Sequence, residues 1–356
     1  MTKIALFGAC GEVGQHIDQA LTALGYHVTR IGRRVRPELT RYVAVDLFDT
    51  ASVINLCYQH DLIINAAGPA SMIRDTIARV AIETHSHYVD VGGEGNVFEQ
   101  LQRDMMSREY ESCCVFGAGF VPGFTSLLAY IAKGKLQEVQ SLELFVGGIE
   151  RFTITSAEDF IASLDGDEAL SGSVIKDGGI VREATKDCYE SPLGTKTFIA
   201  LPYLSTEHQR TAQALLIDNY AAFNLIADRQ LLMTAHGEED QKVPSLVTLS
   251  ESMVKQYGTQ QYCEMEARGW IADQPVTLGL QCRFNNGYRL TGLVAAFTAH
   301  QLLSEKPDSH SHGLFWLSDV IDVDSLISFL RELNLFSHWE LSISPNFALE
   351  FEEGVL

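Results

Sequence analysis

The sequence of 356 residues predicts an α/β protein with an N-terminal Rossmann domain, a doubly wound parallel sheet, followed by a second α+β domain on a mixed or antiparallel sheet. Three observations predict this. An apolar strand at 3–7 runs into spaced glycines and an amphipathic helix, which is how a dinucleotide-binding βαβ unit opens. Short apolar segments then alternate with helical ones as far as residue 119. Beyond residue 139 the apolar segments lengthen and alternate with polar residues, as strands with one covered face do.

The change of pattern also divides the chain. A domain usually has about 100–200 residues, so a chain of this length is expected to form two. We expect a cofactor-binding domain at 1–122 and a substrate and dimerisation domain at 123–312. A C-terminal segment, 313–356, is expected to pack back on the first domain.

The glycine-rich turn after the first strand is the strongest functional signal. Its spacing is G-x-x-G-x-x-G: Gly8 turns the chain, Gly11 lets backbone approach a diphosphate, and Gly14 lets the following helix pack closely. The start of that helix points free N–H groups at an anion. The alternative is a turn that only shapes the domain, but its place between a strand and an amphipathic helix favours a dinucleotide site. The expected phosphate-loop residues are Gly8, Ala9, Cys10, Gly11, Glu12, Val13 and Gly14.

The end of the second strand indicates which dinucleotide binds. This strand, 27–31, is followed by Gly32, Arg33 and Arg34. A carboxylate at this place would bind the 2′-hydroxyl of NAD, whereas guanidinium groups suit the 2′-phosphate of NADP in charge and geometry. We therefore predict NADP as the cofactor. A solvated basic loop is the alternative, and it leaves the missing acid unexplained.

The third strand, 43–45, is followed by Asp46 and Leu47. We place these two residues beside the adenine, with the N-cap of a helix at 50–59 as an equal alternative for Asp46.

The fourth strand, 62–64, is fully apolar and leads into small residues at the carboxyl edge of the sheet, where open α/β sheets bind ligands. A helix at 71–84, a fifth strand from 87, a helix at 96–109 and a sixth strand within 113–119 complete the domain. The small residues expected to contact the cofactor are Ala66, Ala67, Gly68 and Pro69.

The second domain carries no comparable motif. The pattern predicts helices at 124–132, 289–303 and 323–333 and strands at 141–146, 196–200, 264–271 and 276–284. Four arginines are candidates for clamping a substrate carboxylate: Arg151, Arg182, Arg210 and Arg283.

The composition of the chain indicates which classes of partner it is expected to bind. The net charge of −20 repels phosphate backbones and argues against nucleic acid. Residues 1–120 carry only −4 of it (10 Lys+Arg against 14 Asp+Glu), which suits an anionic cofactor. The net negative charge of the remaining residues is explained better by solubility than by electrostatic steering of a cationic substrate. No apolar run approaches the ~20 residues of a membrane span. We expect no membrane partner and no metal, and we interpret His310 and His312 as part of a solvated loop.

The chain opens directly on a strand, which leaves no room for a signal peptide, so we expect a cytoplasmic protein. The seven cysteines show no metal-binding spacing and are expected to be reduced thiols.

Several of these motifs together resemble those of the saccharopine dehydrogenase family, in its reductase-like branch. The resemblance covers about the first 125 residues and is weaker beyond them; Cys10 departs from it, since the family more often has a smaller or hydroxyl residue there. The motifs are residues 8–14, Gly32-Arg33, 65–69, 87–90 with Gly93-Glu94, and 119–123, with a weaker echo at 288–296.

The resemblance implies an NADP(H)-dependent oxidoreductase. Members reduce the C=N bond of an imine, or oxidise the corresponding secondary amine, of small amino-acid-derived substrates. Two alternatives stay open: reduction of an activated C=C or C=O bond, and a non-catalytic NADP-binding protein. We expect a small-molecule substrate and a homodimer.

Such chemistry needs one proton-transferring group near the imine. Tyr88, Asp90 and Glu94 follow the fifth strand at the carboxyl edge of the sheet and are the acid/base candidates. Asp90 and Glu94 are equally suited to holding the loop through backbone N–H groups, and Tyr88 is more often a packed aromatic.

Overall fold

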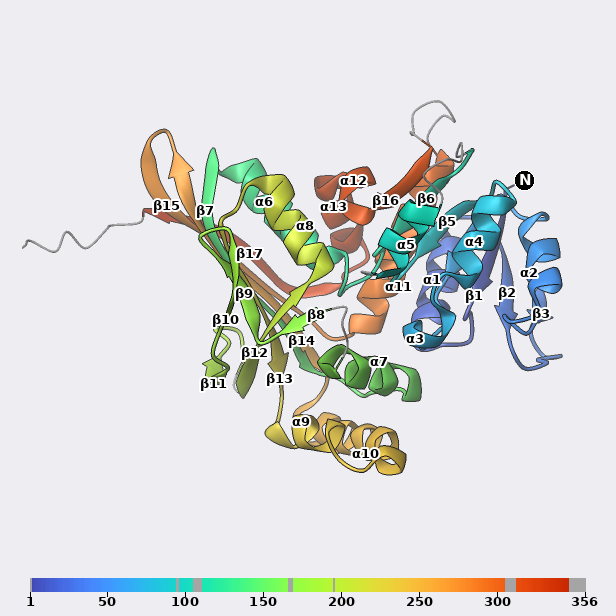
Figure 1. The fold of residues 1–356 in the computed structure, drawn as a ribbon, viewed down its shortest axis with the longest axis horizontal. Helices are drawn as coiled ribbons and strands as arrows, with labels where there is room; N and C mark the ends of the chain where they lie inside the picture. The colour runs from blue at the N-terminus through green and yellow to red at the C-terminus, as the bar shows by residue number, and fades with distance from the viewer. Residues whose placement is uncertain are drawn as a thin grey trace, which may run out of the picture.

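Two sheets organise the computed structural model, which describes residues 2–93, 96–104, 111–165, 169–194, 196–304 and 312–345 (Figure 1). One sheet is parallel and carries the N-terminal elements. The other is mixed and mostly antiparallel. The predicted fold class is confirmed.

The first sheet has seven strands in the order β16-β6-β5-β4-β1-β2-β3. Every strand pairs in parallel with its neighbours, so all the carboxyl ends meet at one edge. The sequence predicted six of these strands, and the seventh comes from the C-terminal segment. The strands are β1 (Lys3–Phe7), β2 (His27–Gly32), β3 (Tyr42–Ala44), β4 (Leu62–Asn65), β5 (His87–Asp90), β6 (Cys113–Phe116) and β16 (Gly313–Trp316).

Helices cover both faces of this sheet because its strands are apolar on both sides. Ile4 and Leu6 belong to one core cluster, and Ala5 and Phe7 belong to another on the opposite face. The first face packs on α1 (Glu12–Ala23) and α11 (Gly287–Ser304); the second packs on α2 (Thr50–Cys57), α4 (Thr76–Glu83) and α5 (Asn96–Asp104).

Helix α11 falls within the range expected for the second domain, yet it packs against α1 and the first sheet. Gly292 permits this close approach, since a Cβ atom there would lie 2.6 Å from His16 Cβ and 3.0 Å from Val13 O.

The helix expected at 71–84 is broken into α3 (Ala70–Ile73) and α4. Arg74, between them, has a positive φ of 48°, which an α-helix does not continue. Of the helix expected at 96–109, the part at 105–109 lies outside the described residues.

The second sheet follows the path β10-β9-β13-β7-β14-β15-β17, with β11, β12 and β8 attached through β13. Strands β7 and β13 are parallel, and the other pairs are antiparallel. Its strands are β7 (Glu138–Ile149), β8 (Ala169–Ser171), β9 (Ser173–Lys176), β10 (Gly179–Arg182), β11 (Lys186–Glu190), β12 (Thr197–Ser205), β13 (Asn219–Ile226), β14 (Gln260–Ile271), β15 (Gln274–Phe284) and β17 (Phe336–Pro345).

Alternation along β7 sends side chains to two different cores. Leu144 joins the core beneath α6 (Phe124–Lys135) and α8 (Thr206–Leu215). Phe145 joins the core formed with α7 (Ile154–Asp165), α9 (Arg229–Ala235) and α10 (Glu239–Tyr257). In Figure 1 these last three helices lie together below the second sheet, and α7 lies between that sheet and the parallel one.

The C-terminal segment contributes to both sheets. Its first strand, β16, pairs with β6 in the parallel sheet, and β17 pairs with β15 from Val276 to Phe284 in the second sheet. Between them lie α12 (Leu317–Val320) and α13 (Val323–Glu332). Because β17 pairs with β15, the segment does not pack on the first domain alone. Residues 346–356 lie outside the described part.

Within the described ranges, no helix is both long and apolar enough to cross a bilayer. All seven cysteines are free thiols, and five of them are buried.

Candidate active site

The loops after β1 and β4 meet at the carboxyl edge of the parallel sheet. A Cβ atom on Gly8 would lie 2.3 Å from Ala66 O and 2.6 Å from Ala67 N, and Gly8 has a φ of +77°. Only glycine permits this turn and this contact between two backbones. The roles predicted for Gly8 as a turn and for Gly14 as a packing contact are confirmed, because a Cβ atom on Gly14 would lie 2.2 Å from Gly8 O.

The N-terminus of α1 lies at the centre of this edge. Gly11 is its N-cap and is exposed, so no cap side chain covers the first-turn N–H groups of Glu12, Val13 and Gly14. Amides in this position form an anion site with the helix dipole. Of the other loop residues, Ala9 is buried, and Cys10 is exposed, with its carbonyl accepting a hydrogen bond from Gln15.

The two arginines lie at the corner beyond β2. Arg33 and Arg34 are exposed, and in the part of the chain that the structure describes neither guanidinium pairs with an acid. The Tyr42 hydroxyl donates to Arg34 O at 2.7 Å, and a Cβ atom on Gly32 would lie 2.5 Å from that hydroxyl. Tyr42 therefore fixes the backbone of this corner while both cationic side chains stay free.

The adenine contact expected of Asp46 stays a prediction. Its carboxylate accepts a hydrogen bond from Phe48 N at 3.0 Å, and the adjacent Leu47 is buried. The alternative role, N-cap of the following helix, is wrong: Asp49 caps α2 by accepting from Ser52 N at 3.3 Å.

The loop after β4 faces the second domain. Pro69 follows Gly68 through a cis peptide bond, and a Cβ atom on Gly68 would lie 2.5 Å from Thr155 Cγ2 of α7. Asp159, also on α7, accepts a hydrogen bond from Ala70 N at 3.0 Å. The second domain thus closes against the small residues 66–69.

Tyr88 and Asp90 lie beneath the site. Tyr88 is 0% exposed and Asp90 is 4% exposed. Asp90 Oδ2 accepts hydrogen bonds from the Tyr88 hydroxyl at 2.5 Å and from Asn65 Nδ2 at 3.0 Å, while Oδ1 accepts from Gly92 N at 2.9 Å. Burial raises the pKa of Asp90, although these donors act against it, and burial raises the pKa of Tyr88 well above its usual value.

This network favours the alternative named for each residue in the sequence analysis, a loop-holding carboxylate for Asp90 and a packed aromatic for Tyr88. Both side chains point to the face covered by α4 and α5, because residues two apart on a strand share a face. Through Asn65 and Gly92 they hold the loops after β4 and β5. Glu94, the third candidate, lies outside the described residues.

The role of Asp90 predicts a large stability effect. In Asp90→Asn, an amide group replaces one acceptor oxygen and faces a donor, which costs about 1–3 kcal/mol for a buried group. We expect urea denaturation to show this loss in the free energy of unfolding. The exposed Asp187→Asn is the control, with a change within about 0.5 kcal/mol. Equal stability of Asp90→Asn and wild type would contradict the positioning role.

The second domain supplies an acid that the sequence analysis missed. Glu150 follows β7 and is partly exposed. Gly287 N donates to both of its carboxylate oxygens at 3.1 and 3.0 Å, and Gln261 Nε2 donates at 3.2 Å. Burial, reinforced by the nearby Glu12, raises the pKa of Glu150 to about 7. No motif marks this residue, because its surroundings come from β14 and α11, more than 100 residues away in the chain.

One of the four candidate arginines reaches this site. Arg151 Nη2 donates to Glu12 Oε1 at 2.7 Å, across the domain boundary. The others bind elsewhere: Arg210 pairs with Asp319, Arg182 donates to Ser171 O, and Arg283 donates to Leu193 O.

The loop 117–123, which follows β6, lines the remaining side of the candidate site. Gly123 N donates to Glu207 Oε2 at 3.0 Å, and Glu207, on α8, is 1% exposed. Burial raises the pKa of Glu207 to about 7. A side chain of the second domain therefore holds this loop as well.

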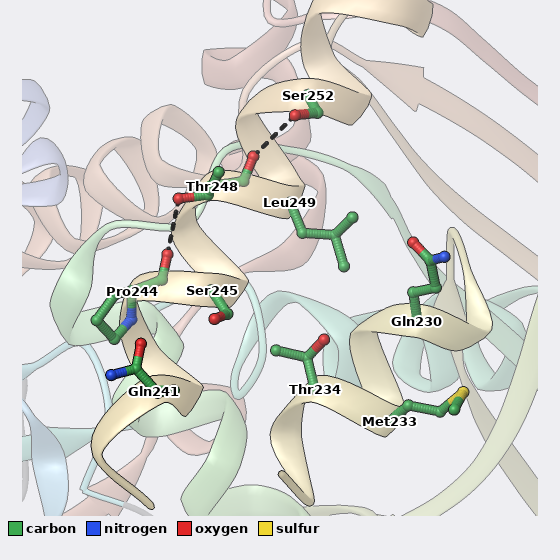
Figure 2. A pocket seen from close by; sticks show the side chains of 9 residues that line it. All are labelled: Gln230, Met233, Thr234, Gln241, Pro244, Ser245, Thr248, Leu249 and Ser252. Atoms are coloured by element: carbon green, nitrogen blue, oxygen red, sulfur yellow. Dashed lines mark hydrogen bonds between the residues drawn. The ribbon is translucent and has the colours of Figure 1, made fainter. Parts of the chain in front are cut away.

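A separate hollow of about 690 Å³ lies between α9 and α10 (Figure 2). Its lining carries no charged side chain, and the hydroxyls of Thr248 and Ser252 donate to carbonyls of their own helix. It lacks the convergent polar groups of a catalytic pocket. Its lining residues are Gln230, Met233, Thr234, Gln241, Pro244, Ser245, Thr248, Leu249 and Ser252.

Comparison with known proteins agrees with this fold. The model of the NAD dependent epimerase/dehydratase family matches residues 4–126. Saccharopine dehydrogenase (L-Glu forming) from Saccharomyces cerevisiae superposes with a TM-score of 0.70, at 13% sequence identity, over 96% of this chain and 100% of that one. The chain has the saccharopine dehydrogenase fold.

Two further structures share this fold less closely. A meso-DAPDH variant from Clostridium tetani, solved with DAP, matches with a TM-score of 0.52 at 13% identity, over 93% of this chain and 99% of that one. An engineered D-amino acid dehydrogenase matches with a TM-score of 0.51 at 14% identity, over 92% and 99%. The resemblance seen in the sequence is confirmed as a likeness of fold, and the N-terminal domain has the Rossmann fold of NAD(P)-binding domains.

Proposed function

We propose that this protein is an NADP(H)-dependent oxidoreductase that reduces the C=N bond of an imine, or in reverse oxidises the secondary amine, of a small amino-acid-derived substrate. The fold of amino-acid dehydrogenases supports the proposal. The observation that carries it is the position of Glu150, a carboxylic acid with a raised pKa on the wall that closes over the dinucleotide-type loops.

The residues present fit the cofactor. Uncapped amides at the start of α1 suit the diphosphate, and the free guanidinium groups of Arg33 and Arg34 suit a 2′-phosphate. Gly11 leaves the approach open, since a Cβ atom there would contact only Gly8 O, at 3.3 Å. NADPH, when bound, supplies the hydride.

The protein's own task is to orient the imine and to supply one proton to its nitrogen. Glu150 holds that proton on its carboxyl group below about pH 7 and regains it from solvent after each turnover. Its two contacts with Gly287 N fix the carboxyl plane. In the reverse direction the ionised carboxylate takes the proton from the amine.

This role predicts a pH dependence. The protonated fraction of Glu150 falls as pH rises through about 7, so imine reduction by the wild type should slow over that range. We expect Glu150→Gln, which keeps an acceptor for Gly287 N, to lose about 100-fold or more in kcat, as for removal of a general acid. Its reduction rate should also lose the inflection near pH 7, while NADPH affinity is unchanged.

The experiment uses NADPH deuterated at C4 with pairs of 2-oxo acids and amines, and mass spectrometry of the product. Deuterium on the carbon next to the new amine supports imine reduction; deuterium in an alcohol or a saturated C–C bond indicates one of the alternative acceptors. The control is Glu251→Gln, an exposed acid near Arg151. A wild-type pH profile in Glu150→Gln would reject Glu150 as the acid.

A further inference from the structure

Arg151 joins the two domains at the start of α1. Its backbone belongs to the second domain, where the Tyr288 hydroxyl donates to Arg151 O at 2.9 Å. Its side chain crosses to the first domain and donates to Glu12 Oε1 at 2.7 Å. Glu251 Oε1 lies farther from the guanidinium, at 3.9 Å. The guanidinium of Arg151 is thus held at the N-terminus of α1, where the uncapped amides can bind an anion.

Glu12 makes this arrangement unusual. A carboxylate in the first turn is stabilised by the helix dipole, but it also places a negative charge where a diphosphate would bind. Arg151 neutralises that charge. The pair is exposed, with 48% of the Arg151 side chain and 38% of the Glu12 side chain accessible, so it contributes little to stability. Contacts between a guanidinium and a phosphate are among the stronger polar contacts.

We propose that Arg151 is a diphosphate-binding residue supplied by the second domain, which exchanges Glu12 for a phosphate oxygen when a nicotinamide dinucleotide binds. This inference rests on the proposed function, because it requires a dinucleotide at α1. Glu12 then acts as an internal competitor that holds Arg151 in place before the cofactor arrives. Arg151 stands on segment 150–159, which already contacts the first domain at Ala70 through Asp159.

Titration calorimetry tests the exchange. Arg151→Gln should weaken NADPH and NADH by the same factor, about tenfold, since both carry the diphosphate. It should leave the weak binding of adenosine 2′-monophosphate unchanged, because that probe has no diphosphate. Glu12→Gln, which removes the competitor, should strengthen both dinucleotides about threefold.

The two variants are expected to change dinucleotide affinity in opposite directions. This difference distinguishes a phosphate-binding role of Arg151 from an ion pair that only links the two domains. If the pair only holds the domains together, both variants weaken dinucleotide binding, and the inference fails. It fails also if Arg151→Gln binds NADPH as the wild type does. The control is Arg229→Gln, which breaks an exposed ion pair with Asp187 elsewhere in the second domain and should change no affinity.

Failure of the proposed function has a different signature, since the wild type itself would then bind neither NADPH nor NADH. Hydrogen–deuterium exchange gives a second readout that needs no turnover. NADPH should protect residues 150–154 in the wild type and protect them less in Arg151→Gln; equal protection in both would also overturn the inference.

Discussion

Gly11→Val is expected to abolish dinucleotide binding in a folded protein. Gly11 has φ −75° and ψ 166°, an extended conformation that valine adopts without strain. Its Cβ atom would lie 3.3 Å from Gly8 O, which a small shift accommodates, while its methyl groups fill the space before the first-turn amides. Each charge-assisted hydrogen bond lost contributes about 1.5–3 kcal/mol, so losing two weakens NADPH by about 100-fold or more.

The control for this variant is another glycine of the same loop. In Gly14→Ala the Cβ atom would lie 2.2 Å from Gly8 O and 2.8 Å from Ala9 Cα, both backbone atoms that cannot move aside. We expect Gly14→Ala to lower the melting temperature, whereas Gly11→Val melts close to wild type. Thermal melting with and without NADPH measures both effects. Wild-type affinity in Gly11→Val would contradict the assignment of the loop.

The double variant Arg33→Ala with Arg34→Ala should change the cofactor preference. Both guanidinium groups are exposed and free of acidic partners in the described structure, so their removal leaves the fold intact. Charged hydrogen bonds to a 2′-phosphate are each worth about 1.5–3 kcal/mol. We expect loss of both contacts to weaken NADPH by about 100-fold or more and NADH, which lacks that phosphate, by less than about threefold.

Calorimetric titration of both cofactors measures this preference. Arg36→Ala is the matched control, since Arg36 is also exposed beyond β2 but already faces Glu38 at 3.6 Å. Equal losses for the two cofactors would remove the 2′-phosphate assignment and favour a protein without preference between them.

The first domain was predictable because its signals are local. The apolar strand 3–7, the glycine turn and the amphipathic helix follow one another directly. The spacing of the apolar residues identifies the strand and the helix, and the glycines identify the turn. The buried strand 62–64 and the small residues after it are equally local. The seventh strand, β16, was missed as a strand of this sheet because its partner β6 lies about 200 residues earlier.

The acid/base candidates depend on long-range contacts, which a sequence does not display. Tyr88 and Asp90 follow the right strand, but the alternation of β5 points them into the core, where Asn65 completes their hydrogen bonds. Glu150 carries no local signal. Its character comes from Gly287 and Gln261, which only the tertiary fold brings to it.

A crystal structure of the full chain with NADPH would show directly which residues bind the diphosphate and the 2′-phosphate. We expect the diphosphate at the amides of Glu12 and Val13 and the 2′-phosphate between the side chains of Arg33 and Arg34. A dinucleotide bound elsewhere, or one with its adenosine away from the two arginines, would contradict this expectation.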